Sequence, residues 1–130
     1  MASRVGIDLV AVESVREALR DHGEHYLRRI YTDREIADCT DGGEPAADRL
    51  AARFAAKEAA IKALRPSRDQ ALAWRSIEVV RGAAGWVELQ LSGSAAVYAE
   101  ESGVAAFALS FTHEGAYAAA VVVAELVAPG

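Results

Sequence analysis

Cysteine is nearly absent from this sequence, and long apolar runs are absent altogether. The single cysteine, Cys39, excludes an internal disulfide and favours a reducing compartment, for which we expect the cytoplasm. No apolar run reaches about 18 residues, so the sequence predicts no segment that spans a membrane. No apolar stretch follows a basic start at the N-terminus, and we therefore expect no signal peptide.

Clustered cysteine and histidine ligands are missing as well, which argues against a zinc site. There is no internal repeat and no low-complexity tract. Hydrophobic residues make up 52% of the sequence and charged residues 25%, which are ordinary values for a globular protein. We therefore expect one domain over residues 1–130.

A net positive charge is found in only one segment of the sequence, at its centre. The net charge is −5, yet residues 49–75 contain seven basic and only two acidic side chains. A cationic segment within an acidic protein argues against nucleic-acid binding, which usually requires a basic domain. It suits the capture of a small polyanion such as a nucleotide. The alternative is a solvated helix and loop without a ligand.

The apolar pattern predicts an α+β domain in which an antiparallel sheet packs against a long central helix and shorter helices. A Thr-x-x-Glu capping box at Thr32 and Glu35 predicts the start of one helix. The residue before Pro66 disfavours helical geometry and should end the central helix. The expected strands cover about residues 4–12, 77–79, 86–91, 105–111 and 116–127, and the expected helices cover about 13–19, 26–30, 32–39, 46–64 and 92–102.

The central helix is the most informative segment. On a helical wheel Lys57 falls within the apolar stripe that starts at Leu50, whereas Glu58 and Lys62 lie together along one edge. An ammonium group on an apolar stripe is costly unless a partner meets it. The arrangement suits a carboxylate that holds a cation beside lysines that meet phosphate.

A carboxylate also stands within the apolar first strand. Asp8 either faces solvent at the strand end or binds a cation. A metal would require a second oxygen ligand, for which Glu58 is the candidate. Magnesium commonly takes one or two carboxylates and completes its octahedron with phosphate oxygens and water.

Three blocks of sequence carry a resemblance to a known family. They are Gly6 to Val10, Arg53 to Leu64, and Leu109 to His113 followed by the apolar run from Ala116 to Val122. In order and spacing they resemble the phosphopantetheinyl transferases of the small holo-acyl-carrier-protein synthase type, over nearly the whole chain.

The resemblance implies a reaction and a set of partners. Such enzymes transfer the 4′-phosphopantetheine group of coenzyme A to a serine of an acyl carrier protein and release adenosine 3′,5′-bisphosphate. The resemblance does not distinguish between the carrier proteins of fatty acid, polyketide and peptide synthesis. Small members are similar to homotrimers with active sites at subunit boundaries, so we expect a homotrimer.

The resemblance also implies roles for individual residues. Asp8 and Glu58 are expected to bind Mg²⁺, and Lys62 is expected to neutralise the diphosphate. Glu58 would take the serine proton either directly or through a metal-held water. The expected contacts of coenzyme A are Arg53, Lys57, Lys62, Arg65, Ser110 and His113.

One segment departs from the family pattern. Where the family usually has a glycine-rich turn, this chain has Arg65-Pro66-Ser67-Arg68. The side chain of Arg65 offers a fork of donors in place of a close backbone approach. The same departure supports the alternative of a non-catalytic module that binds carrier proteins or nucleotides. A purely structural trimer scaffold would explain none of the charged residues.

Overall fold

The computed structural model describes residues 2–127, so Met1 and residues 128–130 of the expected domain lie outside it. The elements follow one another as β1 (Ser3–Ala11), α1 (Val12–Ile30), α2 (Asp33–Asp38), α3 (Ala47–Leu64), the 3₁₀ turn η1 (Trp74–Ser76), β2 (Ile77–Arg81), β3 (Val87–Leu91), α4 (Gly93–Glu101), β4 (Val104–Glu114) and β5 (Tyr117–Leu126). The α+β architecture with an antiparallel sheet is confirmed.

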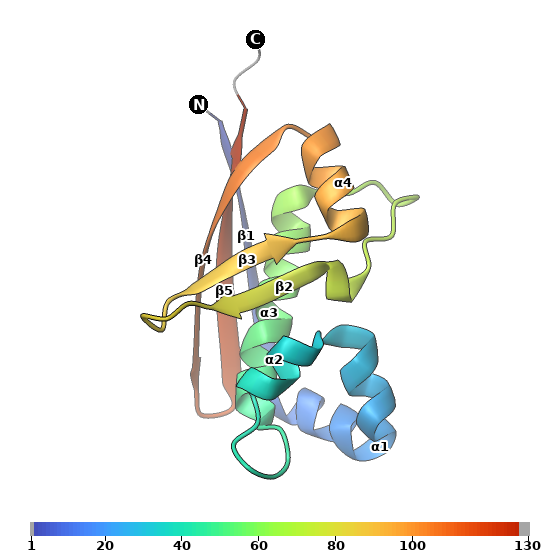
Figure 1. Ribbon diagram of the computed structural model, residues 1–130, viewed down its shortest axis with the longest axis vertical. Helices are drawn as coiled ribbons and strands as arrows, with labels where there is room; N and C mark the ends of the chain where they lie inside the picture. Colours follow the sequence, from blue (N-terminus) through green and yellow to red (C-terminus); the bar gives the residue numbers. More distant parts are fainter. Residues whose placement is uncertain (1, 128–130) are drawn as a thin grey trace.

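Two antiparallel sheets are formed, and the larger one joins the two ends of the chain. Its strand order is β1-β5-β4, so the first strand pairs with the last. Asp8 of β1 lies opposite Ala120 of β5, which in turn lies opposite Phe111 of β4. The smaller sheet is the hairpin of β2 and β3, which crosses in front of the long strands in Figure 1.

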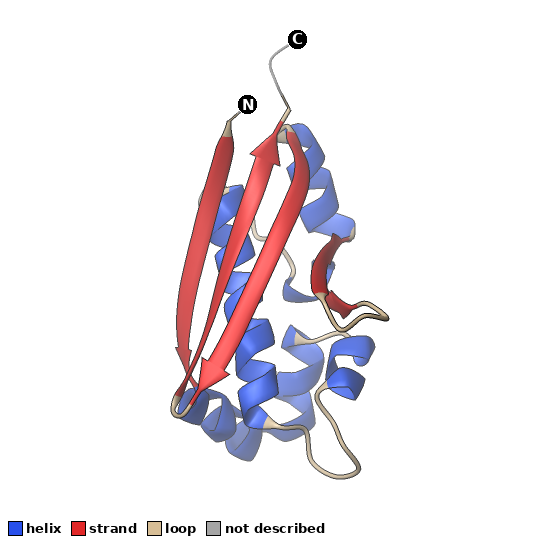
Figure 2. Cartoon of the chain, turned by 90° about the vertical axis from the view of Figure 1, so that its left-hand side faces the viewer, coloured by secondary structure: helices blue, strands red, loops and turns tan. Residues whose placement is uncertain are grey.

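All the helices lie on one side of the three-stranded sheet (Figure 2). Within residues 2–127 no helix covers the opposite face. That face presents alternate residues of β1: Val5 is 61% exposed, Ile7 67% and Leu9 66%. Since strand side chains alternate between faces, Gly6, Asp8 and Val10 point toward the helices.

Helix α3 forms the centre of the molecule. The sequence predicts a buried stripe through Leu50 and Leu64, and both are fully buried. Burial extends much further, because α3 packs between the sheet and the remaining helices and the hairpin. A second face consists of fully buried alanines at positions 51, 52, 55, 56, 59, 60 and 63.

Gly6 lets β1 cross α3 at backbone distance. A Cβ atom at this position would overlap the carbonyl of Ala59 and lie 2.9 Å from the amide nitrogen of Ala63. Only glycine permits an approach this close. The crossing places the next inward-facing residue of β1, Asp8, against the C-terminal half of α3.

The predicted helix boundaries are largely confirmed. Helix α1 is continuous from Val12 to Ile30 except for Gly23, whose φ of 51° and ψ of −127° break it where the sequence predicts a break. Both hydrogen bonds of the capping box between Thr32 and Glu35 are present at the start of α2. Arg65 ends α3 in the left-handed conformation, with φ 56°. Within residues 2–127, none of the helices is both long and apolar enough to cross a membrane.

Candidate active site

Asp8 and Lys62 meet where β1 crosses α3. Lys62 Nζ donates to Asp8 Oδ1 at 3.1 Å and to the carbonyl oxygen of Ile7 at 2.9 Å. The Asp8 side chain is only 16% exposed, whereas that of Lys62 is 53% exposed. The low exposure argues against the alternative in which Asp8 faces solvent at the strand end. The cation beside it here is the ammonium of Lys62, and a metal ion at Asp8 stays a prediction.

Glu58 lies one helical turn before Lys62 and shares this site. Burial raises the pKa of Glu58, the negative charge of Asp8 raises it further, and Lys62 lowers it in part. Gly6 brings β1 against the backbone of α3 at Ala59. Because Lys62 contacts Asp8, Asp8 lies beside the turn of α3 that carries Glu58. Among the described residues the ion pair of Lys62 is with Asp8, and Glu58 lies one helical turn away from Lys62.

Two neighbouring carboxylates with one lysine form a site that can take a further cation. Like charges oppose each other's ionisation, and a divalent ion between them would relieve this repulsion. In the described part of the chain no group of three or more histidine, cysteine, aspartate or glutamate side chains could hold a metal. An ion here would have two protein carboxylates as ligands, which fits magnesium better than zinc.

Arg53 carries buried donors that have no partner. Its side chain is 1% exposed, and its guanidinium lies 5.5 Å from the ring centroid of Phe111 on β4. Nη1 donates to the carbonyl of Arg49 at 3.2 Å, while Nε and Nη2 find no acceptor in residues 2–127. A buried cation without an anion is costly, so this position calls for an anionic group.

His113 lies two residues beyond Phe111 on the same strand. Its Nδ1 is 3.7 Å from Oδ2 of Asp48, in the first turn of α3. Both side chains are nearly half exposed. The structure thus brings His113 to the N-terminal part of α3, where Arg53 also lies. Nothing in the sequence pattern marked Asp48 as its neighbour.

Ser110 lies on the opposite face of the sheet from Asp8. It lines a shallow cavity of about 180 Å³ on the uncovered face, together with side chains such as Ile7 and Val121. The described contacts of this chain therefore do not bring Ser110 to Glu58 and Lys62. A neighbouring subunit on that face would be in a position to use it.

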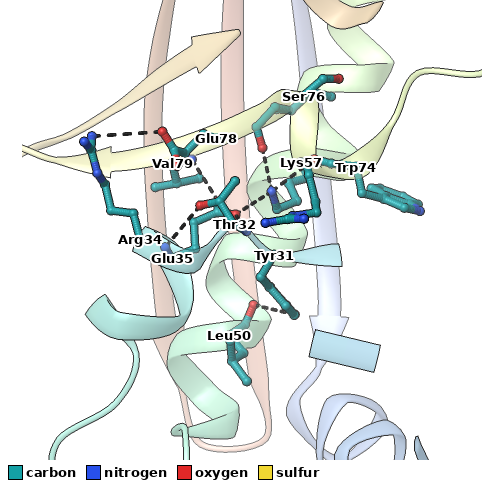
Figure 3. A network of polar contacts seen from close by, with 12 residues as sticks. Tyr31, Thr32, Arg34, Glu35, Leu50, Lys57, Trp74, Ser76, Glu78 and Val79 are labelled. Atoms are coloured by element: carbon teal, nitrogen blue, oxygen red, sulfur yellow. Dashed lines mark hydrogen bonds and ion pairs between the residues drawn. The ribbon is translucent and has the colours of Figure 1, made fainter. Parts of the chain in front are cut away.

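The structure contradicts the ligand contact predicted for Lys57. The side chain is fully buried, and Nζ is 2.7 Å from Oε1 of Glu35, which is also fully buried. The ammonium also donates to the carbonyl oxygens of Trp74 and Ile77, so its three donors are used within the protein (Figure 3). Burial lowers the pKa of Lys57, and Glu35 opposes this shift.

Glu35 was missed as the partner of Lys57. The sequence assigns it only to the capping box of α2, and that role is correct. The available signal was the position of Lys57 on the apolar stripe, which requires a buried acid on a neighbouring element. The pattern did not say which acid.

Arg65 lies just past Lys62 with an exposed side chain. Its carbonyl oxygen accepts a hydrogen bond of 2.8 Å from the hydroxyl of Tyr98 on α4. The backbone at this position is therefore held in place, three residues past Lys62.

Comparison with known proteins agrees with the geometry. The family model described as the 4′-phosphopantetheinyl transferase superfamily matches residues 4–122. A relative named holo-[acyl-carrier-protein] synthase from Halorhodospira halophila is 42% identical over 123 residues, covering 95% of this chain and 97% of the relative. Its namesake in Chloroflexus aurantiacus is 43% identical over 130 residues, covering 92% and 95%.

Solved structures give the same result. The ACPS-CoA complex of Chronobacterium ammoniagenes has a TM-score of 0.84 and 30% identity, covering 98% of this chain and 100% of that one. The holo-[acyl-carrier-protein] synthase of Neisseria meningitidis has a TM-score of 0.83 and 31% identity, covering 94% and 97%. The resemblance carried by the three sequence blocks is thereby confirmed, and the chain belongs to the 4′-phosphopantetheinyl transferase superfamily.

Proposed function

We propose that this chain is a holo-acyl-carrier-protein synthase. It transfers the 4′-phosphopantetheine group of coenzyme A to a serine of an acyl carrier protein and releases adenosine 3′,5′-bisphosphate. The observation that carries the proposal is the ion pair of Asp8 and Lys62 at a partly open position, one helical turn from Glu58. Relatives that share about 40% of the sequence over nearly its full length bear the same name.

We propose further that the reaction depends on magnesium, with Asp8 and Glu58 as the protein ligands. The fit rests on the donor set, which is two carboxylates whose mutual repulsion favours a cation between them. When bound, the ion would neutralise charge on the pyrophosphate of coenzyme A.

Lys62 is suited to meet a phosphate oxygen. Its ammonium has three donors, of which Asp8 and the carbonyl of Ile7 accept two, and its side chain is half exposed. The remaining donor can bind an oxygen of the diphosphate. It would neutralise the negative charge that develops as the bond between the bridging oxygen and the phosphorus bearing the pantetheine breaks.

Glu58 is suited to accept the serine proton. Burial and Asp8 raise the pKa of Glu58 in the chain without an ion, and a bound cation would oppose that shift. The serine proton would pass to the Glu58 carboxylate either directly or through a water held by the metal. At the same time the serine oxygen attacks phosphorus, and the bridging oxygen leaves with adenosine 3′,5′-bisphosphate.

Arg53, His113 and Arg65 complete the expected binding surface for coenzyme A. Arg53 offers two donors without partners, and because they are fully buried a phosphate group of the nucleotide would reach them only after the covering side chains move. His113 lies at the same end of α3. Arg65 lies at the other end and offers its exposed fork to the diphosphate.

We propose a homotrimer in the cytoplasm as the working form. The uncovered sheet face exposes Val5, Ile7 and Leu9, each by more than 60%, and a large apolar patch of this kind usually marks an interface. Ser110 lies on that face. It would contribute to a site at the boundary between two subunits.

The test is the mass of a carrier protein. The purified chain is incubated with coenzyme A, Mg²⁺ and an apo carrier, and the carrier is weighed by intact mass spectrometry. We expect a gain of about 340 Da, the mass of one covalently attached phosphopantetheine group. Binding of coenzyme A or carrier without any gain in mass, across several carriers, would favour the non-catalytic binding module.

The site residues are tested by Asp8→Ala and Glu58→Ala. Each removes one carboxylate of the proposed ion site, so we expect turnover to fall by about 100-fold or more. The transfer rate is measured by carrier mass at saturating coenzyme A. Glu100→Ala, on the exposed side of α4, is the control and should keep the wild-type rate. Near-normal turnover in either site variant would show that the ligand assignment is wrong.

A further inference from the structure

A buried ion pair joins α3 to three other elements on the side away from the sheet. Lys57 of α3 contacts Glu35 of α2 at 2.7 Å, and both side chains are fully buried. The same ammonium is bonded to the carbonyl of Trp74 in η1, at 3.1 Å, and to that of Ile77, where β2 begins. One side chain thereby ties α3 to α2, to η1 and to the start of β2 (Figure 3).

Glu35 is itself held from two further directions. Its Oε1 accepts the backbone N–H of Thr32 at 2.9 Å, and its Oε2 accepts that of Val79 at 2.9 Å. The carboxylate therefore cannot swing away without breaking the cap of α2 and a contact to β2. Lys57 is tied to a rigid partner.

The sheet side of α3 offers much less resistance to movement along the helix axis. Seven fully buried alanines form most of the surface, and β1 contributes Gly6 where it passes them. The long side chains on this side include Arg53, which packs against Phe111, and Lys62, which bonds Asp8 and a backbone carbonyl of β1. Methyl groups form shallow ridges, and the half-exposed Lys62 holds its partner less firmly than a fully buried pair does. The register is therefore fixed more strongly on the other side of α3.

We propose that the Glu35–Lys57 pair sets the register of α3 against β1, and so positions Glu58 opposite Asp8. Glu58 follows Lys57 directly, so any slide or rotation of α3 that Lys57 prevents would move Glu58 by the same amount. A slide of one residue is about 1.5 Å, which is enough to spoil a shared ion site. Glu35 and Lys57 are positioning residues in this account, and the inference rests on the proposed ion site at Asp8 and Glu58.

The pair also holds the far end of the segment that follows α3. Residues 65–73 connect Leu64 to η1, and Lys57 bonds the carbonyl of Trp74 at the end of this connection. Arg65 lies at its beginning. The same ammonium thus limits how far the connection can move relative to the helix that carries Lys62.

The proposal is tested with Mn²⁺ as a paramagnetic probe for the magnesium site. Free Mn²⁺ is measured by electron paramagnetic resonance during titration of the full chain in saturating coenzyme A. The variants are Lys57→Met, Glu35→Gln and the double variant, and Val15→Ala in α1 is the control because it destabilises a buried site elsewhere. Thermal unfolding of each variant is recorded in parallel.

We expect all three pair variants to bind Mn²⁺ about tenfold more weakly or worse, as is typical when support of a metal ligand is lost. Val15→Ala should lower the melting temperature and leave Mn²⁺ affinity within about twofold of wild type. The double variant is decisive, because it leaves no lone buried charge and should regain stability over Lys57→Met. It also keeps the test valid if Lys57→Met does not fold.

The two failures can be told apart. If the double variant regains Mn²⁺ affinity together with stability, the pair is only a stabilising contact and the proposal is overturned. If wild type itself binds no Mn²⁺ in coenzyme A, the ion site is wrong and the positioning role fails with it.

Discussion

Glu58 is a carboxylate in a half-buried position beside a second carboxylate, and this has a measurable cost. Burial and Asp8 raise its pKa above the ordinary value of 4.5. The folded chain therefore binds this proton more tightly than the unfolded chain does. The resulting stabilisation is fully present below the unfolded pKa and is lost as pH rises through the raised folded pKa.

This shift predicts the behaviour of Glu58→Gln, which cannot ionise. In a metal chelator, we expect the stability of wild type relative to the variant to fall as pH rises above the ordinary pKa of 4.5 and through the raised pKa of the folded chain. Thermal unfolding at a series of pH values measures the difference. Glu100→Gln, on exposed α4, is the matched control and should run parallel to wild type. Parallel curves for Glu58→Gln would contradict the raised pKa.

Arg65 holds a backbone conformation that disfavours any side chain with a Cβ. Because φ is 56°, Arg65→Gly removes the free-energy cost of a left-handed conformation for a residue with a Cβ. Glycine also gives the unfolded chain more conformational entropy, which offsets part of this gain. We therefore expect Arg65→Gly to stabilise the chain by about 0.5–1 kcal/mol. If its guanidinium meets the diphosphate, the same variant should raise KM for coenzyme A several-fold.

Arg65→Lys is the control for this prediction, because it keeps both the charge and the strained conformation. It should retain near-normal KM and show no gain in stability. An unchanged KM for coenzyme A in Arg65→Gly would show that Arg65 does not bind the diphosphate. Denaturant unfolding measures the free energy of unfolding, and steady-state kinetics measure KM for coenzyme A.

The close contact between β1 and α3 depends on one glycine, Gly6. Gly6→Ala would drive a methyl group into the backbone of Ala59, and neither backbone can yield locally. We expect a loss of about 3 kcal/mol or more in unfolding free energy, together with reduced turnover, because Asp8 would move with β1. Gly43→Ala is the matched control, since that glycine has open space around it and no positive φ.

Helix ends that depend on neighbouring residues in the sequence could be predicted. Contacts between residues far apart in the sequence could not. The capping box at Thr32, the break at Gly23 and the stop at Pro66 act within a few residues, so the pattern alone locates them. The stripe on α3 correctly marks Lys57 as buried but gives it the wrong partner. Glu35 comes from another helix, and only the three-dimensional fold shows that it lies beside Lys57.

The same distinction holds for the site. Asp8, Glu58 and Lys62 belong to matching sequence blocks, and the structure brings them together. Ser110 belongs to such a block too, yet strand alternation places it on the other face. A motif identifies a residue type at a position, but the face of the sheet depends on strand register.

At the scale of the whole molecule, the sheet is covered on one side only. We expect wild type to have three chain masses in light scattering after size exclusion. Val5→Glu should lower this mass, because it buries a charge in the proposed interface. Val97→Glu is the control, since Val97 is 56% exposed on α4, on the side of the helices. A wild-type mass of one chain would refute the trimer.

The pairing of β1 with β5 has a consequence for synthesis on the ribosome. Asp8 is made long before the strand beside it, which runs from Tyr117 to Leu126. Until that strand leaves the exit tunnel, β1 and β4 have no common neighbour and the nascent helices have no sheet to cover. The three-stranded sheet therefore cannot form before residues 117–126 are made, and a ribosome stalled before residue 117 would hold a chain in which β1 lacks the strand beside it.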